Sequence, residues 1–230
     1  MKKILFIAIS VAATTLAKSQ TYIQGGVNLA NITQTANGQT EKNNMLTTFN
    51  VGLLSRFGIS HTIDLESGVI YSGRGSKAET YYTSTTNDNY VKTKFNPFYI
   101  EVPLNLVVRI PLPSKLNLFV YGGPYASMGV AGKSTSESKI FGVSGSSEQN
   151  IKFANDNPFT SRQDDAAYNK LKRFDFGLNA GAGLDLRKVI LKVNYGYGFT
   201  KINSTEGNNS VDDKNKYRTV SVSLGIPLSR

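Results

Sequence analysis

The side chains that most often act as catalysts are nearly absent from this sequence. Its 230 residues contain one histidine, His61, and no cysteine. Acyl transfer and proteolysis usually need a positioned base, most often histidine. His61 follows Ser60 in a short polar turn, where a histidine is normally a solvated surface group. The sequence has no Gly-x-Ser-x-Gly elbow, and one histidine without cysteine does not make an ordinary zinc site. We therefore predict that the protein is not an enzyme.

Three further motifs carry weak chemical signals. The carboxylate pairs Asp164-Asp165 and Asp212-Asp213 lie in long polar segments. They could bind a divalent cation that bridges lipid phosphates, although ordinary loop charges are the simpler interpretation. The G-x-G at 181–183 lies within an alternating strand and opens no helix, which argues against nucleotide binding. The basic residues are scattered without a patterned basic and aromatic groove, so nucleic acid is not expected as a partner. No cofactor is expected either.

A second kind of chemistry is charge pairing inside the protein. Several charged residues occupy alternate positions in segments whose other positions are apolar. Buried charges are tolerated when they are paired and hydrogen-bonded. We expect Glu66 and Glu101 to meet Arg56, Arg109 or Lys192. The charges predicted to face the interior are Arg56, Glu66, Arg74, Glu101, Arg109, Arg173, Asp175, Asp185 and Lys192. Such a network could form a gated polar path, but a plug that fixes strand register is favoured because eight strands leave no open channel.

The element that must position these charges is clearest at 98–110 (FYIEVPLNLVVRI). Apolar and mostly polar residues alternate there over thirteen positions. Period-two alternation is typical of a β-strand with one apolar face. A strand in a soluble protein usually has about five or six residues, whereas a transmembrane barrel strand needs about nine to eleven. This segment is therefore predicted to cross a membrane.

Eight such segments follow one another along the chain. They cover about 21–33, 45–59, 62–74, 98–110, 116–132, 173–186, 189–202 and 217–228. Short connections near 60–61, 111–115 and 187–188 alternate with long polar ones at 34–44, 75–94, 133–172 and 203–216. This is typical of an outer-membrane barrel with short periplasmic turns and long outer loops. The fold class predicted is all-β: an eight-stranded antiparallel up-and-down transmembrane β-barrel.

The connection at 133–172 is too long for a passive loop in a compact domain. It is expected to be functional or partly disordered, or to contain strand extensions at about 139–143 and 149–153. No oligomeric state can be predicted from the sequence.

Alternation alone does not decide which face points outward. In a soluble barrel the apolar stripe would face inward, so a soluble periplasmic barrel that binds an apolar ligand is the alternative. The polar stripe is rich in Gly and Asn, which suits a crowded lumen better than a solvated surface.

On this basis, the lipid-facing residues are predicted to be Ile100, Val102, Leu104, Leu106, Val108, Leu178, Leu191, Val193, Val222 and Leu224. An aromatic girdle near the lipid head groups is predicted from Tyr71, Phe98, Phe174, Tyr195, Tyr197 and Phe199.

Residues 1–19 are predicted to be a secretory signal peptide. Lys2 and Lys3 form a basic start, an apolar run follows to Ala17, and small residues flank Lys18. Cleavage is expected before Gln20, which leaves 20–230 as the barrel. Loss of the three leader lysines lowers the formal net charge from +10 to +7. A modest basic excess suits contact with anionic lipid head groups, although a solvated surface is the simpler interpretation.

Several stretches in order resemble the PorT-like outer-membrane β-barrel family of Bacteroidetes. They are QGGVNLANIT (24–33), GVIYSGRGSK (68–77), YIEVPLNLVVRI (99–110), YGGPYASMGVAGK (121–133), FDFGLNAGAGLDL (174–186) and VNYGYGFTKIN (193–203). The resemblance implies a small barrel in the cell outer membrane with a structural or interaction role through its outer loops. It also implies an accessory role in protein export. The implied partners are outer-membrane lipid and other envelope or export proteins.

Overall fold

The computed structural model describes residues 19–36, 39–41, 45–84, 87–112, 116–155, 170–186, 188–202 and 216–228. All regular elements in these ranges are β-strands. None of the residues described forms a helix long and apolar enough to cross a membrane. The predicted signal peptide lies outside these ranges except for Ser19, as do the carboxylate pairs at 164–165 and 212–213.

Eight long strands form the wall of the molecule. They are β1 (Ser19–Ala36), β3 (Leu46–Gly58), β4 (Ile63–Gly73), β6 (Asn87–Pro111), β7 (Asn117–Ile140), β11 (Phe174–Asp185), β12 (Ile190–Gly198) and β13 (Lys216–Pro227). The remaining strands are β2 (Gln39–Glu41), β5 (Ser76–Ser84), β8 (Val143–Asn150), β9 (Lys152–Ala154) and β10 (Lys170–Lys172).

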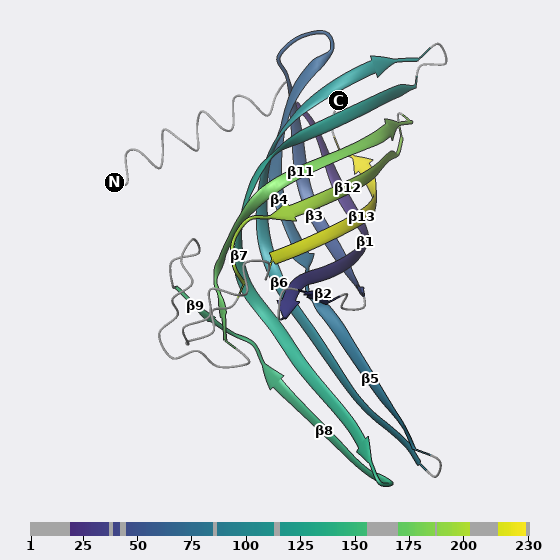
Figure 1. Cartoon of the computed structure of the whole chain (residues 1–230). Coiled ribbons are helices and arrows are strands. Elements are labelled where there is room, and N and C mark those ends of the chain that lie inside the picture. Colours follow the sequence, from purple (N-terminus) through teal and green to yellow (C-terminus); the bar gives the residue numbers. More distant parts are fainter. Residues whose placement is uncertain are drawn as a thin grey trace.

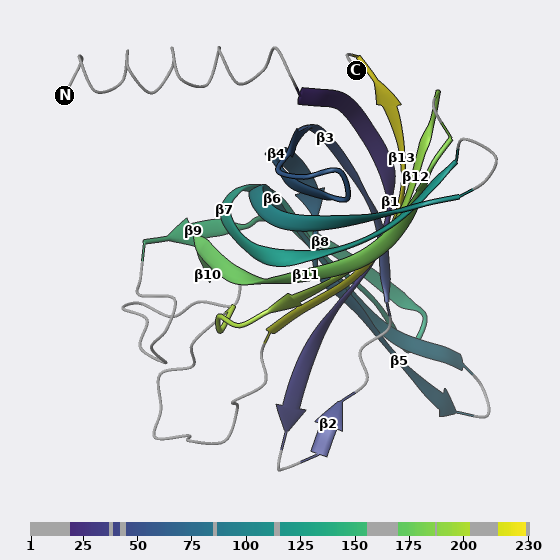
Figure 2. The ribbon, with the colours of Figure 1, turned by 90° about the horizontal axis from the view of Figure 1, so that it is seen from above.

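The eight wall strands close into a ring. Each pairs antiparallel with the next wall strand along the chain. The ring closes where β1 pairs with β13, from Tyr22 opposite Pro227 to Thr33 opposite Lys216. The view from above in Figure 2 shows β1 and β13 side by side. The predicted all-β, eight-stranded, antiparallel up-and-down barrel is therefore confirmed.

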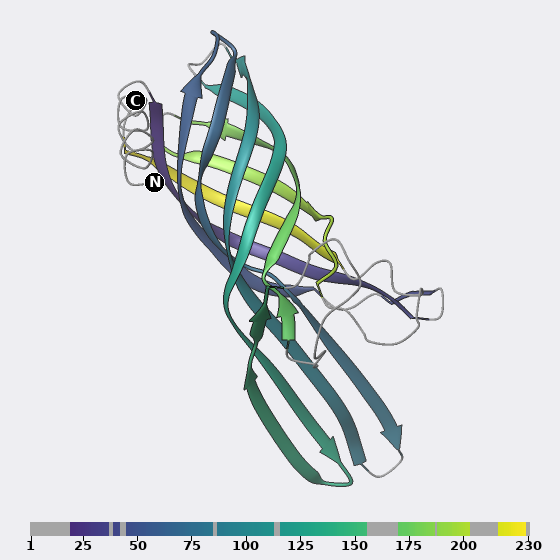
Figure 3. The ribbon, with the colours of Figure 1, turned by 90° about the vertical axis from the view of Figure 1, so that its left-hand side faces the viewer.

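One part of the barrel continues far beyond the ring. β5 pairs with the start of β6, the end of β7 pairs with β8, and β6 and β7 pair with each other along this stretch. Together they form a four-stranded sheet, which we call the outer sheet. Figure 1 shows β5 and β8 running past the barrel body, and Figure 3 shows the outer sheet continuing the slope of the barrel strands.

The outer sheet corrects the expected loops at 75–94 and 133–172. The first is a β-hairpin, and the second begins as one. The strand extension expected at 139–143 is present in part, because Lys139 and Ile140 end β7 and Val143 begins β8. Between them, Phe141 and Gly142 form a tight turn with positive φ angles of 49° and 82°. Residues 149–153 span the end of β8 and the start of β9. The hairpins lack an apolar stripe because neither of their faces covers a hydrophobic core.

The barrel wall has an apolar outer face and a polar inner face. Val102, Leu104 and Leu106 are each 48% exposed, whereas Asn105 between the last two is 2% exposed. This alternation is the reverse of what a soluble barrel requires. The alternative of a soluble barrel with an apolar interior is therefore wrong.

Glycines on the inner face of β11 make room for rings carried by β7. Gly181 lies opposite Tyr121 and Gly183 lies opposite Phe119. A Cβ atom added to Gly181 would lie 2.5 Å from the Tyr121 ring and 2.3 Å from the backbone oxygen of Val193. The glycine-rich stripe in the sequence thus allows aromatic side chains to fill the interior.

Candidate functional site

At the end of the barrel interior near the short turns, the charged side chains gather around the carboxylate of Glu66. It is fully buried and accepts hydrogen bonds from Arg56 Nε, Tyr22 OH and Lys192 Nζ, each at 2.7 Å. Asn105 Nδ2 donates a fourth bond at 3.2 Å. These donors come from strands around the ring, because alternate residues of every strand point inward. One carboxylate thus joins β1, β3, β6 and β12 to β4.

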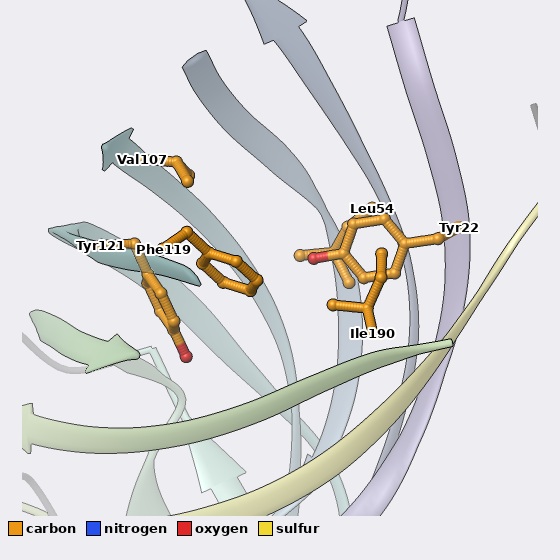
Figure 4. Close-up of a cluster of buried hydrophobic side chains, with 6 residues drawn as sticks. All are labelled: Tyr22, Leu54, Val107, Phe119, Tyr121 and Ile190. Carbon is orange, nitrogen blue, oxygen red and sulfur yellow. The ribbon is translucent and has the colours of Figure 1, made fainter. Parts of the chain in front are cut away.

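Aromatic rings surround the two cations bound to Glu66. The Arg56 guanidinium lies 4.0 Å from the Phe119 ring centroid, and the Lys192 ammonium lies 4.5 Å from that of Tyr121. Both distances suit cation–π attraction. Figure 4 shows Phe119 and Tyr121 facing Tyr22 across the interior, within one buried hydrophobic cluster. Each of the two cations therefore contacts the Glu66 carboxylate on one side and an aromatic ring on the other.

A second charged group lies nearer the outer sheet. Arg74 donates to both Glu101 and Asp175, and it is 3% exposed. Asp175 also accepts hydrogen bonds from Tyr125 OH at 2.9 Å and from the Thr200 hydroxyl. Two carboxylates around one cation give this group a formal charge of −1, whereas the Glu66 group carries +1. The six charges together are balanced.

A small cavity of about 50 Å³ separates the two charged groups. Its wall includes Gln24 and Asn105, which are 6% and 2% exposed. Neither Gln24 Oε1 nor Asn105 Oδ1 has a hydrogen-bond partner within the described residues. A cavity of this size takes a few water molecules rather than a solute.

The outer end of the barrel is covered from within. β9 and β10 pair in parallel, and Phe153 of β9 packs edge-on against Tyr99 with 5.6 Å between ring centroids. Leu171 of β10 is 1% exposed. This cap is a buried cluster of Ile32, Tyr99, Ile151, Leu171, Ile202 and Tyr217, against which Phe95 and Phe153 pack.

The structure brings six of the nine charges predicted to face the interior into these two groups. Arg109 is one of the three outside them; it lies at the short-turn end and pairs with Asp64 at 2.9 Å instead of with Glu66 or Glu101. Glu101 meets Arg74, a partner that the sequence did not suggest.

The two further charges expected inside lie at the ends of the barrel. Arg173 donates to the Phe153 carbonyl at 3.2 Å, and Asp185 accepts from Gln20 at 3.1 Å. His61 is exposed in its turn. Within the described ranges, no group of His, Cys, Asp and Glu could hold a metal ion.

The residues predicted to face lipid all point outward. Ile100 is half-buried, and the other nine are exposed. On the same face, Tyr71 stacks on Phe98 with ring centroids 5.0 Å apart, and Phe49 joins them. Tyr71 and Phe98 are half-buried, whereas the remaining residues of the predicted girdle are exposed farther round the ring: Phe174, Tyr195, Tyr197 and Phe199.

Sequence reasoning missed the neutral partners of the charges, above all Tyr22, Tyr125 and Thr200. Tyr22 alternates in phase with Gln24 and Asn28, so its inward position was readable from the pattern. Its role as a donor to Glu66 was not, because that depends on the register of strands far apart in the chain.

Comparison with known proteins places the chain in a family. A family model described as the outer membrane protein beta-barrel domain matches residues 17–204. Among curated proteins, none matches the sequence significantly.

Solved structures with a similar fold include Ail, the attachment invasion locus protein of Yersinia pestis. It is 16% identical, with 92% of this chain and 99% of that chain covered and a TM-score of 0.40. Neisserial surface protein A (NspA) is 13% identical over 90% of this chain and 97% of that chain, with a TM-score of 0.42. These likenesses are too distant to transfer a role.

The family model covers most of the chain and agrees with the closed eight-stranded ring. The chain therefore belongs to the family of outer membrane protein beta-barrel domains, and it is a small β-barrel protein of the outer membrane.

Proposed function

We propose that this protein is a closed, non-enzymatic barrel that binds other envelope proteins or surface ligands through its outer sheet. The observation that carries the proposal is the open β8 edge. All eight residues of β8 are exposed, and β8 pairs only with β7 among the strands described. An unpaired strand edge offers a row of backbone donors and acceptors to a partner. β8 also lacks the lysine and proline that commonly protect such edges.

The tip of the β7–β8 hairpin supports an interaction role. Ile140, Phe141 and Val143 are 47%, 77% and 75% exposed. Phe141 adopts the left-handed conformation that a bulky side chain rarely takes. Its backbone N–H donates to Asn89 Oδ1 at 2.8 Å, which holds the turn in place. Strain of this kind is commonly stored at functional sites.

The barrel interior supports a structural role for the wall. The Glu66 group, the Arg74 group and the cap fill the lumen at successive levels. We infer that the lumen is closed to solutes, as expected for eight strands. The outward apolar stripe then faces lipid, with the rings of Phe49, Tyr71 and Phe98 at one interface.

Two narrower parts of the proposal rest on sequence alone. Export through a signal peptide at 1–19 predicts that the mature protein begins at Gln20, which N-terminal sequencing would test. An accessory role in protein export rests on the resemblance to PorT-like barrels. It predicts a secretion defect in a deletion strain, restored by the intact gene but not by one that lacks the β7–β8 hairpin.

Site-directed photo-cross-linking in living cells tests the interaction role. A photoreactive residue is placed at Phe141 or Ser146 on the outer sheet. The matched control is His61, which is exposed at the opposite end of the barrel. We expect adducts of defined mass from the two outer-sheet positions and a different pattern from position 61. Absence of adducts from both outer-sheet positions in correctly assembled protein would refute the proposal.

A further inference from the structure

A hollow on the outer sheet contains lysines beside the lipid-facing surface. Its volume is about 340 Å³, and its wall includes Lys77, Lys92 and Lys94. Lys94 lies four residues before Phe98 on β6, so both side chains point to the same face of the strand. The hollow is thus continuous with the outer face of the barrel wall.

The height of the hollow matches that of lipid head groups. Phe98 stacks with Tyr71 in the aromatic cluster that marks the hydrocarbon boundary. Four residues of a strand tilted by about 45° rise roughly 9 Å along the membrane normal. The head-group region extends about 5–7 Å beyond the hydrocarbon. The flexible Lys94 side chain can therefore reach back to the phosphate level.

The lysines of the hollow are arranged for an anion. Lys77 lies directly opposite Lys94 in the pairing of β5 with β6. Like charges in that arrangement repel each other. Lys92 lies two residues from Lys94, and its ammonium is 4.7 Å from the Tyr90 ring centroid. In the part of the chain described, neither Lys92 nor Lys94 forms a salt bridge. An anion bound beside Lys94 would relieve its repulsion with Lys77, and Lys92 lies close enough along β6 to contribute.

Two carboxylates also line the hollow, and both lie directly opposite Lys92: Glu79 on β5 and Glu137 on β7. Glu79 is already engaged, because it accepts hydrogen bonds from Tyr81 OH at 3.1 Å and Lys77 Nζ at 3.4 Å. These bonds lower the pKa of Glu79, so it stays ionised. Three lysines and two carboxylates leave a formal charge of +1 in the hollow.

We propose that the hollow formed by Lys77, Lys92 and Lys94 binds the phosphate group of an outer-leaflet lipid. The lipid tail then lies along the apolar outer face of β6, on the side of Phe98 that is away from the outer sheet. The site anchors the outer sheet to the membrane surface at a fixed height. This inference rests on the proposed lipid-facing surface and is independent of binding at the β8 edge.

Lipid titration followed by native mass spectrometry tests the site. The purified barrel in mild detergent is titrated with phosphatidic acid, and with phosphatidylcholine as the lipid of no net charge. We expect Lys92→Gln and Lys94→Gln each to weaken phosphatidic acid binding about fivefold. Lys139→Gln is the control, because it removes the same charge from the same face farther along the sheet. It should change binding by less than about twofold.

Three results would overturn the inference. Equal losses for Lys139→Gln and Lys94→Gln would show general charge attraction rather than a site. Binding of phosphatidylcholine as tight as that of phosphatidic acid would show that the negative charge of the lipid does not determine binding. Displacement of the lipid by inorganic phosphate at equal concentration would indicate a site for free phosphate.

A nitroxide at position 104 in the same protein separates this inference from the face assignment. In vesicles, contact with dissolved oxygen and protection from water-soluble quenchers are expected at that position. If position 104 contacts lipid but Lys92→Gln and Lys94→Gln leave phosphatidic acid binding unchanged, the phosphate site is refuted and the lipid-facing assignment stands. If the nitroxide is exposed to water, the lipid-facing assignment fails first.

Discussion

Replacement of Glu66 by glutamine should destabilise the barrel more than any change at an exposed carboxylate. The substitution keeps the size of the side chain but removes the charge that meets Arg56 and Lys192 at 2.7 Å each. Those cations are 3% and 5% exposed, so water does not take over the role of the carboxylate. The NH₂ group of the new amide is itself a donor, and it would lie against one of the donors that now bond to the carboxylate.

The size of the effect follows from the burial. Removal of one partner from a buried ion pair typically costs about 3–5 kcal/mol. Folding free energies are of order 5–15 kcal/mol, so the loss would be a large fraction of the total. Adding Lys192→Met removes one of the two uncompensated cations. The double variant should therefore recover part of the loss, with a coupling energy of about 0.5–3 kcal/mol.

Urea titration in lipid vesicles provides the measurement. Folded and unfolded barrels are separated as bands on an unheated denaturing gel. Glu79→Gln on the outer sheet is the matched control and should leave the midpoint unchanged. A midpoint for Glu66→Gln equal to that of the control would refute the reasoning, as would a double variant less stable than Glu66→Gln.

Three further predictions use the same barrel. Leu104→Arg should cost about 2–4 kcal/mol near the bilayer midplane and reduce recovery of folded protein in outer membranes; normal assembly would mean that Leu104 does not face lipid. Gly181→Ala should cost about 1–3 kcal/mol in the urea titration, because its Cβ would lie 2.3 Å from a backbone oxygen. Gly25→Ala, with nothing within 4 Å of the added atom, is the control and should not destabilise the barrel. Glu101→Gln should open no large conductance in planar bilayers, and large steady currents from the wild type would contradict a closed lumen.

The sequence predicted the wall of the barrel well because alternation is a local property. The thirteen positions of 98–110 show which residues share a face, and the family to which the chain belongs is consistent with the apolar face being outermost. The outer sheet was anticipated only as short strand extensions at about 139–143 and 149–153, for the same reason. Ser144, Ser146 and their neighbours carry no apolar period, because every residue of β8 is exposed and none covers a hydrophobic core.

The interior was predictable as a set of residues but not as a set of contacts. Arg74 and Glu101 could be assigned to the lumen from their phase in the strands. Their contact could not, because it depends on the tilt and register of strands around the closed ring. Arg109 shows the limit most clearly. It has the correct phase, but it lies at the end of its strand and meets Asp64 there.

The partners of Glu66 also imply an order of assembly. Arg56 is ten residues away in the adjacent strand of the same hairpin, so it can neutralise Glu66 as soon as β3 and β4 pair. Lys192 is 126 residues away on the far part of the ring and arrives only when β12 takes its place. A half-built barrel therefore carries the carboxylate already compensated. The ion pair between Lys192 and Glu66 forms only when β12 has joined the ring, so it stabilises the closed barrel but not the isolated β3–β4 hairpin.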